Sequence, residues 1–384
     1  MQRETCVQTI DIGILLSTEG TYSHMAKSAL AGARHALAEI NADPRYPFQL
    51  QARHINPAGN LAAYSEAVSY FIAAGIHHIF GTITSASRKE IIPDLEQHNL
   101  LLWYGCPYEG FESSEQVIYL GGCPNQTLIP LLRLALETMG QRAWLIGSNY
   151  VWGWESNRIA REVVEAAGGS VVGEKYLHLR HGEVTELVEN ILDAGVDFVL
   201  NNLVGDSSYA FLRALDAACL RRGQRLAVLS CNFTEAEVEE VAPLHAVRLL
   251  SCGPFFESVD PVFCARQRQQ HGAQRISHYY VGAWRAVKLF ADSLRLAGDS
   301  QPDALLAALH HQYDETSPGA HAVLAQNNHA MLPCYIAELQ QERFQLLHSE
   351  PQPVMPDPYL SATDLSQGLP VAMSPARPVL RIVK

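Results

Sequence analysis

The 384-residue sequence lacks the features that mark several classes of protein. No apolar run approaches the roughly 20 residues that a membrane-spanning helix needs. The formal net charge of −12 gives no cationic footprint for DNA or RNA, whose binding depends on contacts to phosphate. We therefore expect no membrane partner and no direct binding of nucleic acid.

A secretory signal is also missing from the first residues. Such a signal needs a continuous apolar segment, but Arg3, Glu4 and Asp11 interrupt this stretch, and a strand-like alternation begins at Thr9. This start favours a cytoplasmic location.

Motifs of cysteine and histidine chemistry are lacking too. The eight cysteines form no CxxC pair and no zinc-type spacing with histidine, so we interpret most of them as buried, reduced thiols. We interpret the adjacent histidines His77/His78 and His310/His311 as structural or surface residues, because neighbouring side chains on a strand or helix point apart. No metal site and no cofactor are expected.

Enzyme signatures are absent as well. The sequence has no GxSxG elbow, no GxxxxGK(S/T) phosphate loop, no GxGxxG after the first strand and no HExxH. A catalytic interpretation, for example a hydrolase, rests only on isolated residues such as Cys106 and Asp206. We do not expect an enzyme.

The sequence does contain a regular alternation of strand-like and helix-like segments from residue 9 to about residue 250. After a break at 121–125 the same rhythm starts again, which indicates two blocks. Parallel strands need crossover connections, and helices supply them on both faces of a sheet. We therefore predict an α/β fold with two doubly wound parallel sheets. Beyond this region, 260–312 is predicted to be mostly helical, and 350–384, with seven prolines, to be irregular.

Open α/β sheets bind ligands beyond the carboxyl ends of their strands, where helix N-termini present free backbone N–H groups. In the first block this rule selects the loops 81–85 and 104–107. Ser85 has two equally weighted interpretations, as a ligand contact or as a helix cap. Tyr104 has an apolar ring with a polar tip, which suits a small neutral ligand, and Cys106 is interpreted as pocket wall because no base is identifiable beside it.

In the second block the equivalent loops are 148–152 and 203–207. Tyr150 and Trp152 alternate on a segment that we predict to be an extended loop, where they either face a ligand from the opposite lobe or plug the core. Asp206 is either a ligand-binding carboxylate or the N-cap of a helix at 207–222, and the cap is favoured.

At these loops the sequence resembles the type I periplasmic-binding-protein family, and within it the amide sensors of amidase operons and their relatives in urea and short-chain amide uptake. The resemblance covers about residues 10–359. Its most specific stretches include PYEGFE at 107–112, PNQ at 124–126, ESN at 155–157 and QNNH at 326–329.

The resemblance implies a bilobed protein that closes on a small amide, with three crossovers between the lobes. The N-lobe would comprise 1–121 and 255–327, the C-lobe 122–254 and 328–349, and 350–384 would form an irregular tail. The implied ligand-binding residues are Ile83, Ser85, Tyr104, Cys106, Pro107, Tyr150, Trp152, Asp206 and Phe233.

Four of these positions depart from the pattern of the amide sensors. Tyrosines are replaced by Ile83 and Trp152, a threonine by Cys106, and a threonine-like position by Asp206. Loss of hydroxyl groups predicts a pocket of altered size and polarity, and this weakens the case for acetamide itself as the ligand.

The resemblance favours a cytoplasmic small-amide sensor that controls an amide- or nitrile-degrading operon through ligand-dependent binding of an RNA-binding antitermination regulator. The alternative is the substrate-binding component of an ABC importer for amides, urea or branched-chain amino acids. A homo-oligomer is compatible with both roles. In either case the ligand must bind the closed arrangement of the lobes better than the open one.

Overall fold

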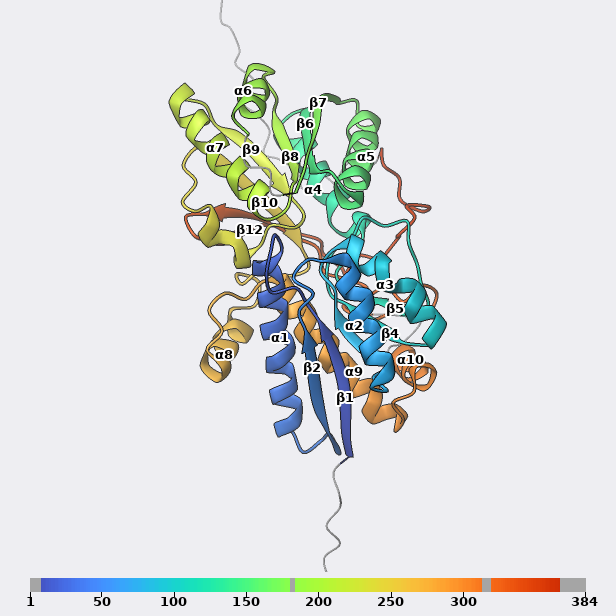
Figure 1. Ribbon diagram of the computed structural model, residues 1–384. Coiled ribbons are helices and arrows are strands. Elements are labelled where there is room, and N and C mark those ends of the chain that lie inside the picture. Colours follow the sequence, from blue (N-terminus) through green and yellow to red (C-terminus); the bar gives the residue numbers. More distant parts are fainter. Residues whose placement is uncertain (1–7, 180–183, 313–318, 367–384) are drawn as a thin grey trace, which may run out of the picture.

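The computed structural model describes residues 8–179, 184–312 and 319–366. It has two α/β lobes, the N-lobe in the lower half of Figure 1 and the C-lobe in the upper half. Each lobe is built on one sheet, with helices on both faces. This arrangement confirms the α/β class and the two doubly wound sheets predicted from the alternation.

The N-lobe sheet has five parallel strands in the order β2-β1-β3-β4-β5. The strands are β1 (Gln8–Leu15), β2 (Phe48–Ile55), β3 (His78–Gly81), β4 (Leu101–Tyr104) and β5 (Val117–Tyr119). The helices are α1 (Ser23–Ala42), α2 (Leu61–Ala73), α3 (Ser85–His98), α8 (Pro261–His271), α9 (His278–Ala297) and α10 (Pro302–His311). Helices α1 and α9 pack together on one face of the sheet, and α2 packs with α3 on the other.

The C-lobe sheet has seven strands in the order β12-β11-β10-β9-β8-β6-β7. The strands are β6 (Arg142–Ser148), β7 (Ser170–Leu177), β8 (Phe198–Asn202), β9 (Leu226–Ser230), β10 (Val247–Gly253), β11 (Tyr335–Gln340) and β12 (Arg343–Ser349). The helices are α4 (Leu128–Thr138), α5 (Val151–Ala166), α6 (Thr185–Asp193) and α7 (Asp206–Arg222), with short 3-10 helices η1 (Pro124–Gln126) and η2 (Glu235–Glu240). Strands β11 and β12 pair antiparallel at one edge, which the alternation of strands and helices did not predict.

The chain passes between the lobes three times. The first crossover joins β5 to η1 and α4, the second joins β10 to α8, and the third joins α10 to β11. The three segments contribute Leu120, Pro254 and Leu332 to the lining of one cavity, so residues far apart in the sequence lie near one another there.

The element boundaries differ from the predictions where tertiary contacts act. Helix α5 begins at Val151, four residues before the predicted start at residue 155. The predictions omitted β5 and β12, because β5 is only three residues long and β12 is an edge strand with mostly exposed side chains. The part of the proline-rich tail that the structure describes is irregular, and it is held by Asn125, whose Oδ1 accepts from Asp357 N at 2.9 Å. The rest of the tail, 367–384, lies outside the described residues.

Cysteines and histidines occupy structural positions. The seven cysteines in the described segments are free and buried, and Cys6 lies outside them. His78 is buried in the N-lobe, with its Nε2 2.8 Å from Ser300 O, and His310 Nε2 lies 2.9 Å from Asn328 Oδ1. Among the described residues no cluster of three or more acidic, histidine or cysteine side chains suits a metal ion.

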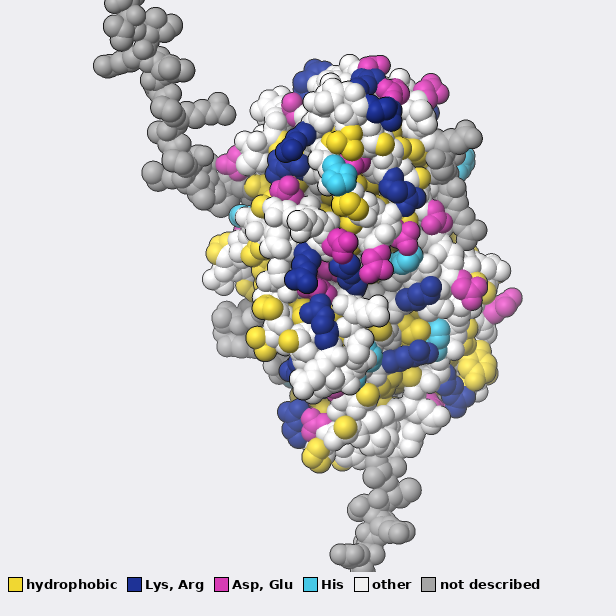
Figure 2. All heavy atoms as spheres, turned by 90° about the vertical axis from the view of Figure 1, so that its left-hand side faces the viewer, with side chains coloured by type: hydrophobic (Ala, Val, Ile, Leu, Met, Phe, Trp, Pro, Cys, Tyr) yellow, Lys and Arg dark blue, Asp and Glu magenta, His cyan; other side chains and the backbone are white. Residues whose placement is uncertain are grey.

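Surface charge is mixed in sign. On the face shown in Figure 2, Lys and Arg side chains are interspersed with Asp and Glu rather than gathered in one basic patch. None of the helices within the described segments combines the length and hydropathy that a membrane span requires.

Candidate functional site

A cleft of about 320 Å³ lies between the two lobes, at the carboxyl ends of both sheets. The cleft is lined by Tyr22, Met25, Ile83, Thr84, Ser85, Cys106, Pro107, Tyr150, Trp152, Val204, Asn232 and Tyr279. Six of the nine residues proposed from the resemblance are in this set, whereas Tyr104, Asp206 and Phe233 are not.

Ser85 is the first residue of α3 and does not cap the helix. The N-cap is Thr84, whose Oγ1 accepts from Ser87 N at 3.0 Å. The Ser85 hydroxyl instead donates its proton to the Glu109 carboxylate, and both side chains are buried. With its proton committed, Ser85 Oγ is available to a ligand in the cleft only as an acceptor.

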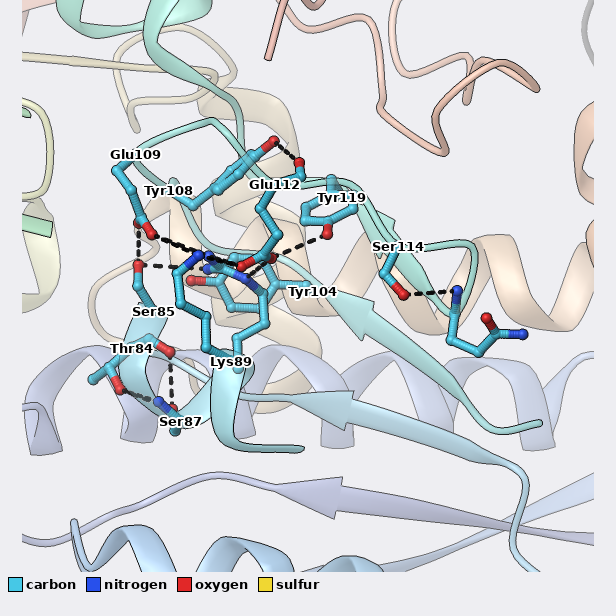
Figure 3. Close-up of polar contacts among 12 residues, drawn as sticks. Thr84, Ser85, Ser87, Lys89, Tyr104, Tyr108, Glu109, Glu112, Ser114 and Tyr119 are labelled. Atoms are coloured by element: carbon cyan, nitrogen blue, oxygen red, sulfur yellow. Dashed lines mark hydrogen bonds and ion pairs between the residues drawn. The ribbon is translucent and has the colours of Figure 1, made fainter. Parts of the chain in front are cut away.

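Behind Ser85, four charged side chains form a cluster in which Arg88 and Glu109 are buried and Lys89 is partly exposed (Figure 3). Arg88 is completely buried, and its Nε donates to Glu112 Oε1 at 2.6 Å while its Nη2 lies 3.4 Å from Glu109 Oε1. Lys89 Nζ reaches Glu112 Oε2 at 2.5 Å. Burial alone raises the pKa of Glu112, but the charges and hydrogen bonds of Arg88 and Lys89 outweigh it and lower that pKa to about 2. The cluster thus balances two cations with two carboxylates beneath the cleft.

Tyr104 lies one layer behind the cleft surface. It is completely buried, and its hydroxyl donates to Ile83 O at 2.9 Å. The guanidinium of Arg88 stacks on its ring, 4.7 Å from the ring centre. Tyr104 therefore supports the loop that carries Ile83 rather than lining the cleft.

Cys106 forms part of the cleft wall. Its thiol is buried and donates to Thr82 O at 3.4 Å. Burial raises the pKa of this thiol above its ordinary value, so the side chain is a neutral thiol at physiological pH. This environment is the opposite of the one that activates a nucleophilic cysteine.

On the C-lobe side, Tyr150 and Trp152 do not alternate on an extended loop. Tyr150 is the extended N-cap residue of α5, and Trp152 already lies in the first turn of that helix. Trp152 is 6% exposed, and its indole Nε1–H has no hydrogen-bond partner among the described residues. Burial of an unpaired donor is costly, so this group is available to an acceptor atom of a ligand.

The structure places Asp206 and Phe233 away from the cleft. Asp206 is exposed in the first turn of α7, and the N-cap is Gly205, so the favoured assignment of Asp206 as the cap is wrong. Phe233 is buried in the C-lobe core, with its ring against Tyr209. Its neighbour Asn232 is the residue that reaches the cleft.

The predicted site residues did not include several of the residues that line the cleft. Tyr22 and Met25 follow the turn after β1, so the rule of strand carboxyl ends selects their loop too, but the rule was applied only to later strands. Tyr279 comes from α9, after the second crossover, and no local pattern marks it. Only the packing of α9 beside α1 brings this residue to the cleft.

The lobes touch one another around the cleft. The hydroxyls of Tyr22 in the N-lobe and Tyr150 in the C-lobe share a hydrogen bond, and burial raises the pKa of Tyr22 to about 12. Tyr279 OH donates to Asn232 O at 3.1 Å. The lobes are therefore in a closed arrangement.

A third closing contact involves backbone. A Cβ on Gly205, at the start of α7, would lie 2.1 Å from Thr21 O in the N-lobe. Gly205 also has a φ of 55°, which an L side chain rarely adopts. Glycine at this position therefore allows the two lobes to meet.

No charged side chain lines the cleft in the described segments. The polar groups at its surface are hydroxyls of serine, threonine and tyrosine, one amide and the indole N–H. The carboxylates of Glu109 and Glu112 lie behind Ser85 and are paired with cations. The cleft therefore favours a neutral ligand, because an unpaired ionic group would lose its hydration without a counter-ion.

Comparison with known proteins gives the class of this fold and site. The family of the periplasmic binding protein domain matches residues 10–365, and the chain belongs to this family. Solved structures of similar fold include a solute-binding protein of an ABC transporter from Rhodopseudomonas palustris in complex with p-hydroxybenzoic acid. That protein is 16% identical, with a TM-score of 0.81, and the match covers 93% of this chain and 100% of that one.

Two further solved structures share the fold at a comparably low sequence identity. An amino acid ABC transporter substrate-binding protein from Pseudomonas fluorescens is 16% identical, with a TM-score of 0.75 and coverage of 92% of this chain and 98% of that one. A branched-chain amino acid transporter substrate-binding protein from Streptococcus pneumoniae, in complex with isoleucine, is 12% identical, with a TM-score of 0.76 and coverage of 89% and 100%. These three proteins are named as binding proteins and not as enzymes, and at such identities the likeness establishes the fold.

Proposed function

We propose that this protein binds a small neutral amide or urea in the interlobe cleft, as the substrate-binding component of an ABC importer. One observation carries the choice of ligand. The cleft offers an acceptor, Ser85 Oγ, and an unpartnered donor, Trp152 Nε1–H, and no charged side chain. A primary amide or urea presents the complementary N–H donor and carbonyl acceptor on one small group.

The acceptor role of Ser85 argues against a carboxylate at this point of the cleft. A carboxylate oxygen needs a donor, but the Ser85 proton is held by Glu109. The ligands of the solved relatives, an aromatic acid and an amino acid, both carry a carboxylate. We therefore infer that the pocket chemistry of this chain differs from theirs, although the fold is shared.

The importer role is supported by the family and by the names of its relatives in transport. The role as a cytoplasmic sensor that binds an antitermination regulator remains a prediction from the resemblance to amide sensors. The two roles differ in location and partner. Cell fractionation of the native producer separates them, because a cytoplasmic pool that co-purifies with an RNA-binding protein would contradict the importer.

The ligand proposal is tested by calorimetric titration of the purified protein with acetamide, butyramide, benzamide, urea, isoleucine and 4-hydroxybenzoate. We expect at least one neutral amide or urea to bind, and to raise the thermal midpoint as its concentration exceeds Kd. Ser85→Ala and Trp152→Phe should each weaken that binding about tenfold, since each removes one hydrogen bond of roughly 1.5 kcal/mol.

Ser87→Ala is the matched control for these variants. Ser87 lies on the same helix, but its hydroxyl donates to Thr84 O at 2.9 Å and it does not line the cleft. The affinity of the Ser87→Ala variant for the amide should stay within twofold of that of the wild type. Preference for isoleucine or 4-hydroxybenzoate over every neutral ligand would contradict the proposal.

A further inference from the structure

Glu109 is almost completely buried and does not line the cleft, but it contacts Ser85, which does (Figure 3). The two oxygens of its carboxylate have different partners. Oε2 accepts the proton of the Ser85 hydroxyl. Oε1 faces two cations, at 3.4 Å from Arg88 Nη2 and 3.5 Å from Lys89 Nζ. Oε2 is therefore the oxygen that acts on the cleft, through Ser85.

Arg88 fixes the orientation of the Glu109 carboxylate. The Arg88 guanidinium is completely buried and stacks on the rings of Tyr104 and Tyr108, 4.7 and 4.8 Å from the ring centres. Its Nε also donates to Glu112 Oε1 at 2.6 Å. A guanidinium with these contacts has little freedom to move. Rotation of the Glu109 carboxylate would break a buried ion pair, which is costly.

This orientation sets the hydrogen-bonding character of Ser85. A serine hydroxyl has one proton and two lone pairs. The proton points to Glu109, and Arg88 Nη1 lies 3.5 Å from Ser85 Oγ, near one of the lone pairs. The other lone pair remains for a donor in the cleft. An amide N–H can use this lone pair, whereas a carboxylate oxygen would meet it without a proton between the two oxygens.

We propose that Glu109 is a positioning residue that sets the specificity of the cleft for amides over the corresponding carboxylic acids, by holding the proton of Ser85. This inference rests on the proposed function and deepens it, because it assigns the selectivity to a residue outside the cleft. An amide and its acid, such as acetamide and acetate, have nearly the same size and shape. Discrimination between them therefore requires hydrogen bonds of fixed direction rather than a particular cleft volume.

Glu109→Gln should reverse the role of Ser85. The oxygen of the new side chain remains the acceptor for Arg88 and Lys89, so its NH₂ group takes the place of Oε2 and donates to Ser85 Oγ. The Ser85 proton is then free to point into the cleft. An amide in the cleft loses its acceptor, and a carboxylate gains a donor.

Calorimetric titration of the full-length protein at pH 7 with acetamide, acetate, butyramide and butyrate tests the inference. Glu112→Gln is the matched control, because Glu112 pairs with the same two cations while the Ser85 proton goes to Glu109. This control measures the effect of removing one negative charge from the cluster. The ratio of amide affinity to acid affinity should fall about tenfold further in Glu109→Gln than in Glu112→Gln.

Two more variants separate the hydrogen bond from other effects. When Ser85→Ala is already present, Glu109→Gln should change the ratio no more than Glu112→Gln does, because the hydroxyl through which Glu109 acts is missing. If Glu109→Gln does not fold by circular dichroism, Glu109→Asp replaces it. The shorter side chain keeps the charge but draws the carboxylate back from Ser85, so the ratio should shift in the same direction.

The inference would be overturned by equal ratios in Glu109→Gln and Glu112→Gln, or by an undiminished shift in the presence of Ser85→Ala. In either case, binding of an amide by the wild type would leave the proposed function standing. If neither acetamide nor butyramide binds the wild type, the inference about Glu109 fails, and the wider titration that includes urea decides the proposed function separately.

Discussion

At the scale of single residues, burial and pairing set the ionisation of the acidic side chains near the cleft. Glu112 has cationic neighbours that keep it ionised. Glu235 and Glu237 lie in η2 of the C-lobe and have no cationic neighbour that acts as strongly. Burial raises the pKa of each to about 8. Glu237 accepts from Tyr209 OH at 3.0 Å, but these hydrogen bonds do not offset the loss of hydration.

This difference predicts how stability depends on pH. A carboxyl whose pKa is raised on folding holds its proton more tightly in the folded state, so its contribution is fully present below about pH 4.5 and is lost as pH rises toward 8. Buried histidines such as His78, whose pKa burial lowers to about 4, change stability in the opposite sense, so the effect of Glu237 is measured as a difference between wild type and variant. Urea unfolding at pH 5 and pH 8 should show that Glu237→Gln gains stability relative to wild type over this range, on the order of a few kcal/mol, whereas Glu239→Gln, on the exposed side of η2, should not. A difference between Glu237→Gln and wild type that is the same at both pH values would be contrary to the burial argument.

The buried cluster gives a second prediction at this scale. Arg88 is completely buried between Glu109 and Glu112, so Arg88→Met should lower the free energy of unfolding by about 3 to 5 kcal/mol, because it leaves carboxylates buried without their partner. Lys89 contacts the same carboxylates but is 38% exposed, so Lys89→Met should cost less than about 1 kcal/mol. Chemical denaturation measures the loss in free energy of unfolding for each variant. Equal losses in the two variants would contradict the prediction.

At the scale of elements, the starts of α1, α3, α5 and α7 bring side chains or backbone to the cleft. Each helix follows a strand, so its first turn lies at the carboxyl edge of a sheet. The exact start decides which side chain faces inward. Because α5 begins at Val151, Trp152 is helical and lines the cleft, and because α7 begins at Asp206, that carboxylate points away to solvent.

Gly205 tests the role of these helix starts in closure. Gly205→Ala places a Cβ against Thr21 O of the other lobe, so we expect the affinity for the amide to fall at least tenfold through loss of the closed arrangement. Gly223→Ala is the matched control, since it also has a positive φ, of 63°, but nothing lies within 4 Å of its Cβ. Both should lose about 1 kcal/mol of stability from backbone strain, and only Gly205→Ala should lose affinity. Equal affinities in calorimetry would rule out the closure contact.

At the scale of the whole molecule, several contacts between the lobes hold the closed arrangement. Besides the tyrosine pair, the Tyr279 hydrogen bond and Gly205, His24 Nε2 lies 3.2 Å from Glu240 Oε1, and Arg158 stacks on Phe111 with 4.7 Å between guanidinium and ring centre. The last two contacts are partly exposed and individually weak. We therefore expect the free-energy difference between the open and closed forms to be small enough for a ligand's binding energy to shift the equilibrium.

Small-angle scattering checks this expectation. The radius of gyration of the wild type should decrease on addition of a saturating amide, toward that of the closed arrangement in Figure 1. Gly205→Ala should retain the larger radius under the same conditions, because its Cβ opposes contact between the lobes. An identical radius with and without ligand in a protein shown to bind would mean that closure does not depend on the ligand.

Much of the fold was predictable because it depends on local periodicity. Alternating strands and helices require parallel sheets, and the break near residue 121 marked the first crossover between two of them. The rule of strand carboxyl ends also selected Ile83, Ser85, Cys106 and Trp152 or their loops, since it follows from the direction of the chain alone. The oligomeric state, the location and the regulator partner stay predictions.

The sequence by itself determined the fold class, the two lobes and most of the loops at the cleft, because each depends on patterns among residues close together in the chain. The tertiary structure decided which side chains face the ligand, since that depends on the helix start and on packing between segments far apart. It buried Tyr104, turned Asp206 outward and brought Tyr279 to the cleft.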